Sequence, residues 1–148
     1  MGIYFVNATM KNAKETRGRI NLEIAVMKLL LAGNTADLEI LRRQFEAATV
    51  ESRKDSGYGF FVAYHVPEAI SRLPENRSFS FGDVAAEIDG LKHGAGFVLF
   101  VKDGAISMLE AYSYDELWPE SITNFSLRYH PGPEKDLESL VKKWRSDQ

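Results

Sequence analysis

Residues 97–113 read FVLFVKDGAISMLEAYS, and this stretch decides the fold class. Phe97 to Val101 is a continuous apolar run of the length expected for a buried central strand. The pair Asp103-Gly104 follows it, and such a pair favours a tight hairpin turn because both residues tolerate positive φ. Ala105 to Ser113 then returns from the turn. The stretch therefore predicts a hairpin inside an antiparallel sheet.

Further strands are expected on both sides of this hairpin. One set of residues alternates strictly with another, which is the period of a strand: Thr123, Phe125, Leu127 and Tyr129 alternate with Asn124, Ser126, Arg128 and His130. Tyr58 to Val66 is rich in aromatic and β-branched residues and ends at a proline, and Thr49 to Lys54 precedes it across a turn signal. Residues 84–88 alternate as a half-buried strand does, with a short helix over residues 83–88 as the alternative. The chain thus has about five to six expected strands.

Two helices are expected before the strands. Residues 20–32 carry a broad apolar stripe, which predicts a well-buried helix, and Gly33-Asn34 is a stop signal. Asn34 or Thr35 can cap a second helix. Its predicted inward face is Leu38, Leu41, Phe45 and Ala48, and its predicted outward residues are Arg42, Arg43, Gln44 and Glu46. Together the two helices predict an N-terminal helical hairpin.

A last helix is expected at the end of the chain. Leu137, Leu140, Val141 and Trp144 follow the i, i+3, i+4, i+7 spacing of an amphipathic helix. Helices grouped at the two ends of a run of strands indicate the α+β class rather than α/β. We therefore expect one α+β domain over residues 1–148, with helices on one face of the sheet and the other face partly open.

Composition narrows the classes of function. The 148 residues include no cysteine, which excludes thiolate catalysis, disulfides and cysteine-bound metals, and favours a reducing compartment. The net charge of −3, without a clustered basic surface, argues against nucleic-acid binding. No segment has the pattern of a signal peptide or a membrane span. We expect a cytoplasmic protein without a cofactor.

The stretch from Glu110 to Glu120, EAYSYDELWPE, is the strongest candidate for function. Aromatic side chains give large contact area at low entropic cost, and acidic groups suit a basic partner, so the stretch predicts a recognition surface. The alternatives are that Trp118 and one tyrosine cover the core while the acids face water, or that Glu110 pairs with Asp115 or Glu116 in acid–base catalysis. The candidate binding residues are Glu110, Tyr112, Tyr114, Asp115, Glu116 and Trp118.

The glycine-rich segment from Gly90 to Gly96 adds His93 to these candidates. It leads into a strand rather than a helix, so it predicts a tight connection and not a phosphate-binding loop. His93 is far in sequence from His65 and His130, and the three do not have the spacing of a local metal motif. No nucleophilic-serine motif is present either. We assign no catalytic and no metal-binding residue.

A set of short motifs runs through the middle of the chain. It comprises Gly57-Tyr58-Gly59-Phe60-Phe61, Val66-Pro67, residues 93–100, Asp103-Gly104, residues 109–112, Tyr114 and Trp118-Pro119. As a set over residues 38 to 120, these motifs resemble a family of small uncharacterised bacterial proteins, in which a glycine is typical where Ala111 stands. The resemblance implies a bacterial cytoplasmic protein. The final segment is similar in style to the small acidic immunity proteins of bacterial toxin systems.

Two hypotheses about function follow from the sequence. The first is a non-enzymatic interaction module, immunity-like or regulatory, that binds a protein partner through the acidic-aromatic stretch and the open sheet face, or binds a second copy of itself as a homodimer. The alternative is a small hydrolase-like or ligand-binding protein in which Glu110, Asp115 and His93 converge in a pocket.

Overall fold

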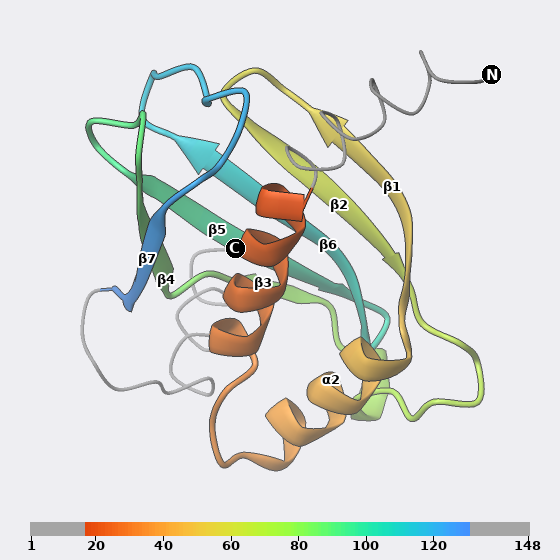
Figure 1. Cartoon of the computed structure of the whole chain (residues 1–148). Coiled ribbons are helices and arrows are strands. Elements are labelled where there is room, and N and C mark those ends of the chain that lie inside the picture. Colours follow the sequence, from red (N-terminus) through yellow and green to blue (C-terminus); the bar gives the residue numbers. More distant parts are fainter. Residues whose placement is uncertain (1–16, 131–148) are drawn as a thin grey trace, which may run out of the picture.

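A computed structural model describes residues 17–130, and within them two helices precede an antiparallel sheet (Figure 1). Residues 17–30 form the first helix, and α2 is Ala36–Ala47. The remaining elements are β1 (Thr49–Asp55), β2 (Gly59–His65), a 3-10 turn (Pro74–Asn76), β3 (Phe79–Phe81), β4 (Val84–Ile88), β5 (Ala95–Lys102), β6 (Ala105–Ser113) and β7 (Phe125–Tyr129). The predicted α+β class is confirmed.

The predicted hairpin forms the middle of the sheet. Its strands are β5 and β6, which pair so that Leu99 faces Leu109, and its turn contains Asp103 and Gly104, both with positive φ. The strand order is β1-β2-β6-β5-β4-β7, and β3 also pairs with β5. The hairpin therefore has strands of the same sheet on both sides, so neither β5 nor β6 is an edge strand.

The sheet has seven strands, so the expectation of five to six is wrong in number. The missed strand is β3, whose Phe79 and Phe81 are buried and pair with β5. Three residues are too short a run for alternation to be recognised in the sequence. After β3 the chain bends at Gly82, where an added Cβ would lie 1.9 Å from the carbonyl oxygen of Phe97, and continues as β4 along the same edge of β5. Residues 84–88 thus form a strand and not the alternative short helix.

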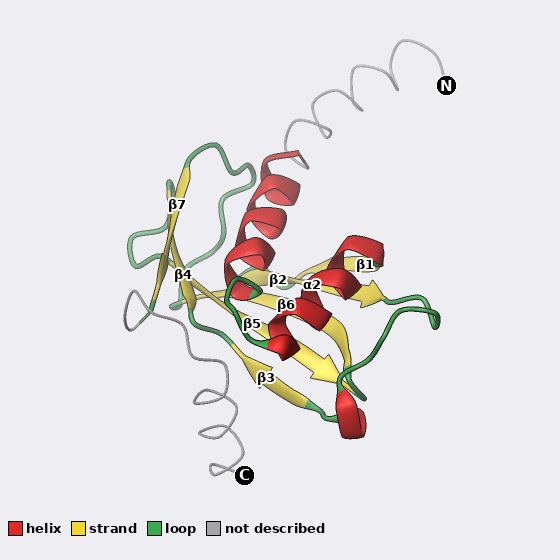
Figure 2. Ribbon diagram, turned by 90° about the horizontal axis from the view of Figure 1, so that it is seen from below, coloured by secondary structure: helices red, strands yellow, loops and turns green. Residues whose placement is uncertain are grey.

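The two described helices lie on one face of the sheet, as predicted (Figure 2). Their buried leucines, among them Leu22, Leu30 and Leu41, form one core with inward residues of the sheet such as Val62 and Leu99. No described helix covers the opposite face, which we call the outer face. Residues that are neighbours in register on the outer face include Phe61, Glu110 and Val98.

The residues between the helices cap α2 as predicted, but the two helices do not form the predicted hairpin. Thr35 caps α2 by accepting a hydrogen bond from Leu38. Arg42 donates to the carbonyl oxygens of Leu31 and Gly33 just after the first helix. Figure 1 shows α2 turning away from the first helix instead of returning alongside it. The predicted C-terminal helix lies outside the described residues.

Gln44 is a correction to the predicted outward face of α2, because its side chain is fully buried. Its Nε2 donates to the carbonyl oxygens of Ser71 and Gly104, and its Oε1 accepts from the amide of Ile106. One amide side chain therefore joins the helix to the turn between β5 and β6, which positions the central hairpin.

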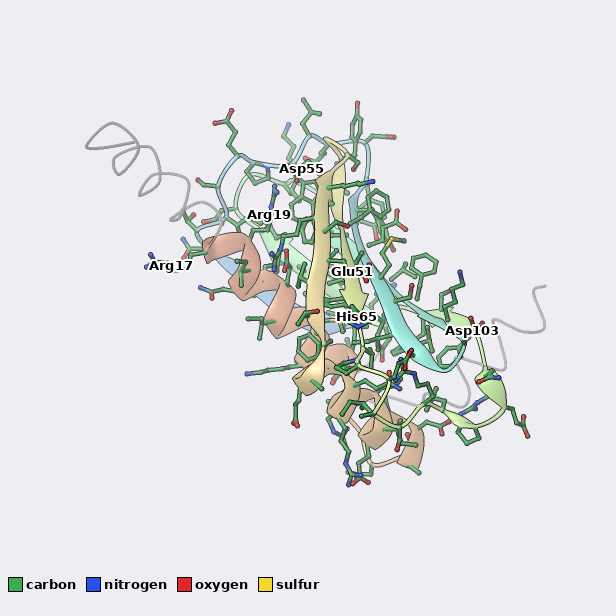
Figure 3. The ribbon with its side chains drawn as sticks, turned by 90° about the vertical axis from the view of Figure 1, so that its right-hand side faces the viewer. Arg17, Arg19, Glu51, Asp55, His65 and Asp103 are labelled. Carbon is green, nitrogen blue, oxygen red and sulfur yellow. The ribbon has the colours of Figure 1, made fainter. Side chains whose placement is uncertain are left out.

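The edge strand β1 is fastened to the first helix by charged groups. Arg53 donates to both carboxylate oxygens of the buried Glu23, at 3.0 and 3.1 Å from its Nε. Arg19 pairs with Asp55 near the end of the same strand (Figure 3). These pairs hold the helix against a strand whose own side chains are mostly exposed.

Candidate functional site

Three connections meet at one end of the sheet. They are the β1–β2 turn (residues 56–58), the β4–β5 turn (residues 89–94) and the β6–β7 loop (residues 114–124), and all three lie at the top of Figure 1. The β6–β7 loop contains most of the acidic-aromatic stretch. Its position between the other two connections means that its conformation depends on contacts with both of them.

Glu116 joins the β6–β7 loop to the β4–β5 turn. Its Oε1 accepts a hydrogen bond of 2.7 Å from the amide of Lys92, and its Oε2 accepts one of 2.9 Å from the amide of His93. These two bonds to the charged form lower the pKa of Glu116 from its usual value. The backbone carbonyl oxygen of Glu116 also accepts from the hydroxyl of Ser113. Glu116 is therefore an anchor of the loop, and its carboxylate already has two donors.

Trp118 joins the same loop to the β1–β2 turn. Its amide donates to the carbonyl oxygen of Gly57 at 2.9 Å, and its ring meets Phe60 edge-on with centroids 5.3 Å apart. Its indole Nε1 is buried and has no hydrogen-bond partner within residues 17–130. This is the arrangement of the alternative in which Trp118 covers the edge of the core.

With these anchors in place, other side chains of the loop point outward. Leu117 is 68% exposed and Tyr114 is 52% exposed, and the acids Asp115 and Glu120 are exposed as well. Tyr58, on the neighbouring β1–β2 turn, is 53% exposed. Leu117 lies beside that turn, since a Cβ on Gly57 would be 3.8 Å from its Cδ2. We call Tyr58, Tyr114, Asp115, Leu117 and Glu120 the end surface.

Sequence reasoning missed Tyr58 and Leu117 as exposed apolar residues of this surface. Tyr58 was assigned to a strand, and the structure begins β2 one residue later. Leu117 stands in the candidate stretch but is neither acidic nor aromatic. No sequence signal marked it, because the neighbours that hold it outward, Glu116 and Trp118, are anchored by partners far away in the sequence.

Tyr112 and Glu110 belong to a different surface. Both lie on β6 and point to the outer face, where Tyr112 is in register with Gly59 and Gly96. An added Cβ on Gly96 would lie 2.4 Å from the ring of Tyr112, so the ring covers this glycine. Tyr112 also meets the ring of Tyr114 edge-on at 5.8 Å. The pair Tyr112 and Tyr114 thus connects the outer face to the end surface.

A cleft of about 650 Å³ lies beside the end surface, over β4, β7 and the β4–β5 turn. Ala85 and Ser126 are small residues of its wall on neighbouring strands. The charged and aromatic groups that line it include Glu87, Lys92, His93, Tyr114, Arg128 and His130. Most of its lining is polar, so its chemistry suits a polar molecule.

The structure does not bring the three residues of the enzymatic alternative together. His93 lines the cleft, whereas Glu110 and Asp115 are absent from its lining. Glu110 lies in the middle of the outer face between Phe61 and Val98. Glu116, the other acid considered as its catalytic partner, is occupied by the amides of Lys92 and His93.

His65 lies apart from the other two histidines. Its Nδ1 is 3.6 Å from a carboxylate oxygen of Glu51 on β1, and both side chains are exposed (Figure 3). Within residues 17–130, no group of histidine, aspartate and glutamate has the arrangement of a metal site. In the same range, no helix is long and apolar enough to cross a membrane.

Comparison with known proteins gives no relative. No family model, no curated protein and no solved structure matches the chain.

Proposed function

We propose that the protein is a recognition module that binds a protein partner through the end surface. The observation that carries this proposal is the contrast between anchored and exposed side chains in the β6–β7 loop. Glu116 and Trp118 are fixed to two other connections, while Leu117 between them is 68% exposed. An exposed apolar side chain between two anchored neighbours is held out toward solvent.

Such a loop is suited to binding because its conformation is already restricted. Ordering a loop on binding costs free energy, and a loop held in place beforehand avoids part of that cost. Tyr58 and Tyr114 add aromatic contact area beside Leu117, and tyrosines are frequent in the energetic centres of interfaces. Asp115 and Glu120 would face basic groups at the rim of the partner. A bacterial, immunity-like partner system remains a prediction from the sequence resemblance.

The test replaces exposed side chains of the loop and leaves the anchors Glu116 and Trp118 unchanged. Tagged full-length protein is used to capture partners from its source cells, with Tyr114→Ala/Leu117→Ala as the test variant. Both side chains are exposed, so we expect the variant to fold like the wild type and to lose the partner. Ile24→Ala/Val50→Ala is the matched control, because Ile24 and Val50 are exposed apolar residues of the first helix and β1.

Each outcome decides the proposal. A stoichiometric partner that is retained by Ile24→Ala/Val50→Ala and lost by Tyr114→Ala/Leu117→Ala supports the end surface. A partner retained by both variants, or lost by both, contradicts it. The melting temperature of each variant is measured alongside, because a partner lost through unfolding would be accompanied by a lower Tm.

The second candidate function is the binding of a small polar molecule in the cleft, and the polar lining beside His93 favours it. The residues involved would be Lys92, His93 and Arg128 instead of the predicted Glu110 and Asp115. A thermal-shift screen of phosphorylated, carboxylated and zwitterionic molecules tests it with Arg128→Ala as the variant. A ligand that raises the Tm of the wild type but not of Arg128→Ala supports this function. A shift equal in both proteins places the ligand elsewhere.

A further inference from the structure

The outer face of the sheet carries mostly apolar side chains, and one of them, Phe61, has a charged residue on each neighbouring strand. One row of neighbours across β1, β2, β6 and β5 is Lys54, Phe61, Glu110 and Val98. The adjacent row is Ser52, Ala63, Met108 and Phe100. The larger apolar members of both rows are half-buried, and no described helix lies over them (Figure 2).

Glu110 is the unusual member of this face. It is half-buried, and its nearest neighbours across the strands are Phe61 and Val98. Within residues 17–130 its carboxylate forms no ion pair, and neither does the ammonium group of Lys54. A half-buried carboxylate with apolar neighbours and no paired cation is a position at which a binding partner can supply one.

We propose that the outer face binds the outer face of a second copy of this chain, with Lys54 of each copy opposite Glu110 of the other. The register gives the symmetry. Lys54 and Glu110 lie on the two sides of Phe61, one strand away in each direction. A two-fold axis that runs along the strand direction above Phe61 exchanges the two sides. It therefore brings the two Phe61 side chains together and places each lysine over the partner's glutamate.

The self-complementary charges are what select a second copy over another occupant. Sheets that pack face to face lie about 10 Å apart, which a lysine and a glutamate side chain can bridge. With the axis above Phe61 on β2, the strands that face their counterparts are β1, β2 and β6, and these span roughly 10 Å from the axis of β1 to the axis of β6, since strands are about 4.8 Å apart. Such a contact is smaller than the standard specific interface of about 800 Å² per partner, so we expect a weak dimer rather than an obligate one.

The experiment measures the mass of the full-length protein by sedimentation at concentrations from about 1 to about 500 µM, the range that suits a weak interface. The wild type is expected to shift from monomer to dimer over this range. Lys54→Glu and Glu110→Lys each place like charges opposite one another, and each is expected to weaken the dimer at least about tenfold. The double variant Lys54→Glu/Glu110→Lys restores opposite charges and is expected to recover the dimer.

The double variant also distinguishes loss of the interface from loss of the fold. Lys28→Glu and Glu46→Lys are control reversals at exposed positions of the helices, on the other side of the sheet. A dimer that is weakened by the single reversals, recovered by the double one and untouched by the controls supports the proposal. A wild type that stays monomeric throughout, or a dimer indifferent to Glu110→Lys, overturns it. Failure of the double variant to recover the dimer overturns the proposed pairing as well.

This proposal and the end surface can fail separately. The end-surface variant Tyr114→Ala/Leu117→Ala leaves Lys54, Phe61 and Glu110 unchanged. A dimer that persists in that variant while the protein partner is lost shows two independent surfaces.

Discussion

Glu116 and His93 are joined by a hydrogen bond of 2.9 Å between the carboxylate of the first and the backbone amide of the second. The other carboxylate oxygen of Glu116 accepts from the amide of Lys92 in the same way. One side chain thereby links the β6–β7 loop to the β4–β5 turn. Because the donors are backbone amides, this link does not require particular side chains in the turn. The geometry of the end surface depends on the charge of this carboxylate.

We predict that Glu116 makes the stability of the protein depend on pH. Its pKa in the folded protein is lowered from the usual value of 4.5, chiefly by the amide of Lys92 and then by that of His93. A carboxylate with a lowered folded pKa stabilises the protein above its unfolded pKa, and this contribution is lost as the pH falls through the folded pKa. Urea unfolding between about pH 3 and pH 6 covers this window.

Glu116→Gln removes the titrating group and should flatten this part of the pH dependence. The variant is expected to be less stable than the wild type at pH 6, with the difference shrinking toward pH 3. Glu120→Gln is the control, because Glu120 is exposed and forms no hydrogen bond within the described residues. A wild type and a Glu116→Gln variant that differ by the same amount at every pH would show that the charge of Glu116 does not matter.

Trp118 is predicted to contribute to stability rather than to direct contact with a partner. Its ring packs on Phe60 and its amide holds the β1–β2 turn. Replacement of a packed aromatic residue by alanine costs about 3 kcal/mol or more, so Trp118→Ala should lower the free energy of unfolding by about that amount. Trp118→Phe keeps an aromatic ring and removes an indole N–H that is buried without a partner in residues 17–130, so we expect a loss of less than about 1.5 kcal/mol.

Urea unfolding of both variants provides the measurement. Partner binding provides a second readout, since Trp118→Phe should retain the partner that Tyr114→Ala/Leu117→Ala loses. A Trp118→Phe protein that is as stable as the wild type but no longer binds would make Trp118 a contact residue and reverse its assignment here.

The sequence predicted the strands wherever the local pattern was long enough. The hairpin of β5 and β6 could be recognised from its continuous apolar run and its Asp-Gly turn, and β7 could be recognised because its side chains alternate over at least five residues. β3 has three residues and was missed. Gln44 was placed outward because amide side chains usually are, but its partners Gly104 and Ile106 are 60 and 62 residues away in the sequence.

The sequence places the candidate stretch at the end of a strand and in the loop that follows, and the structure has most of it in the β6–β7 loop. The roles of the individual side chains in that loop could not be predicted. Glu116 and Asp115 are adjacent acids, and nothing in the sequence distinguishes their roles. In the structure, Glu116 accepts from two amides, whereas Asp115 is exposed with φ of 61°. This difference arises from backbone donors that lie 24 and 23 residues away in the sequence. A local sequence pattern contains no information about partners that are so distant in the sequence.

Arg53 is predicted to be essential for stability through Glu23, whose side chain is 4% exposed. Arg53 supplies the cation for this carboxylate, and hydrogen bonding to Glu23 is the main reason that its own pKa is raised. Removal of one member of a buried pair leaves an uncompensated charge and costs about 3 kcal/mol. We therefore expect Arg53→Ala to lower the free energy of unfolding in urea by about 3 kcal/mol.

The double variant Glu23→Leu/Arg53→Met distinguishes a buried charge from lost packing. Replacement of both partners by apolar residues of similar size is often neutral, because no charge is then left without a partner. We expect this variant to be within about 1 kcal/mol of the wild type, and clearly more stable than Arg53→Ala. If instead the double variant were as unstable as Arg53→Ala, the pair itself would hold β1 to the first helix, and its attraction would exceed the cost of its desolvation.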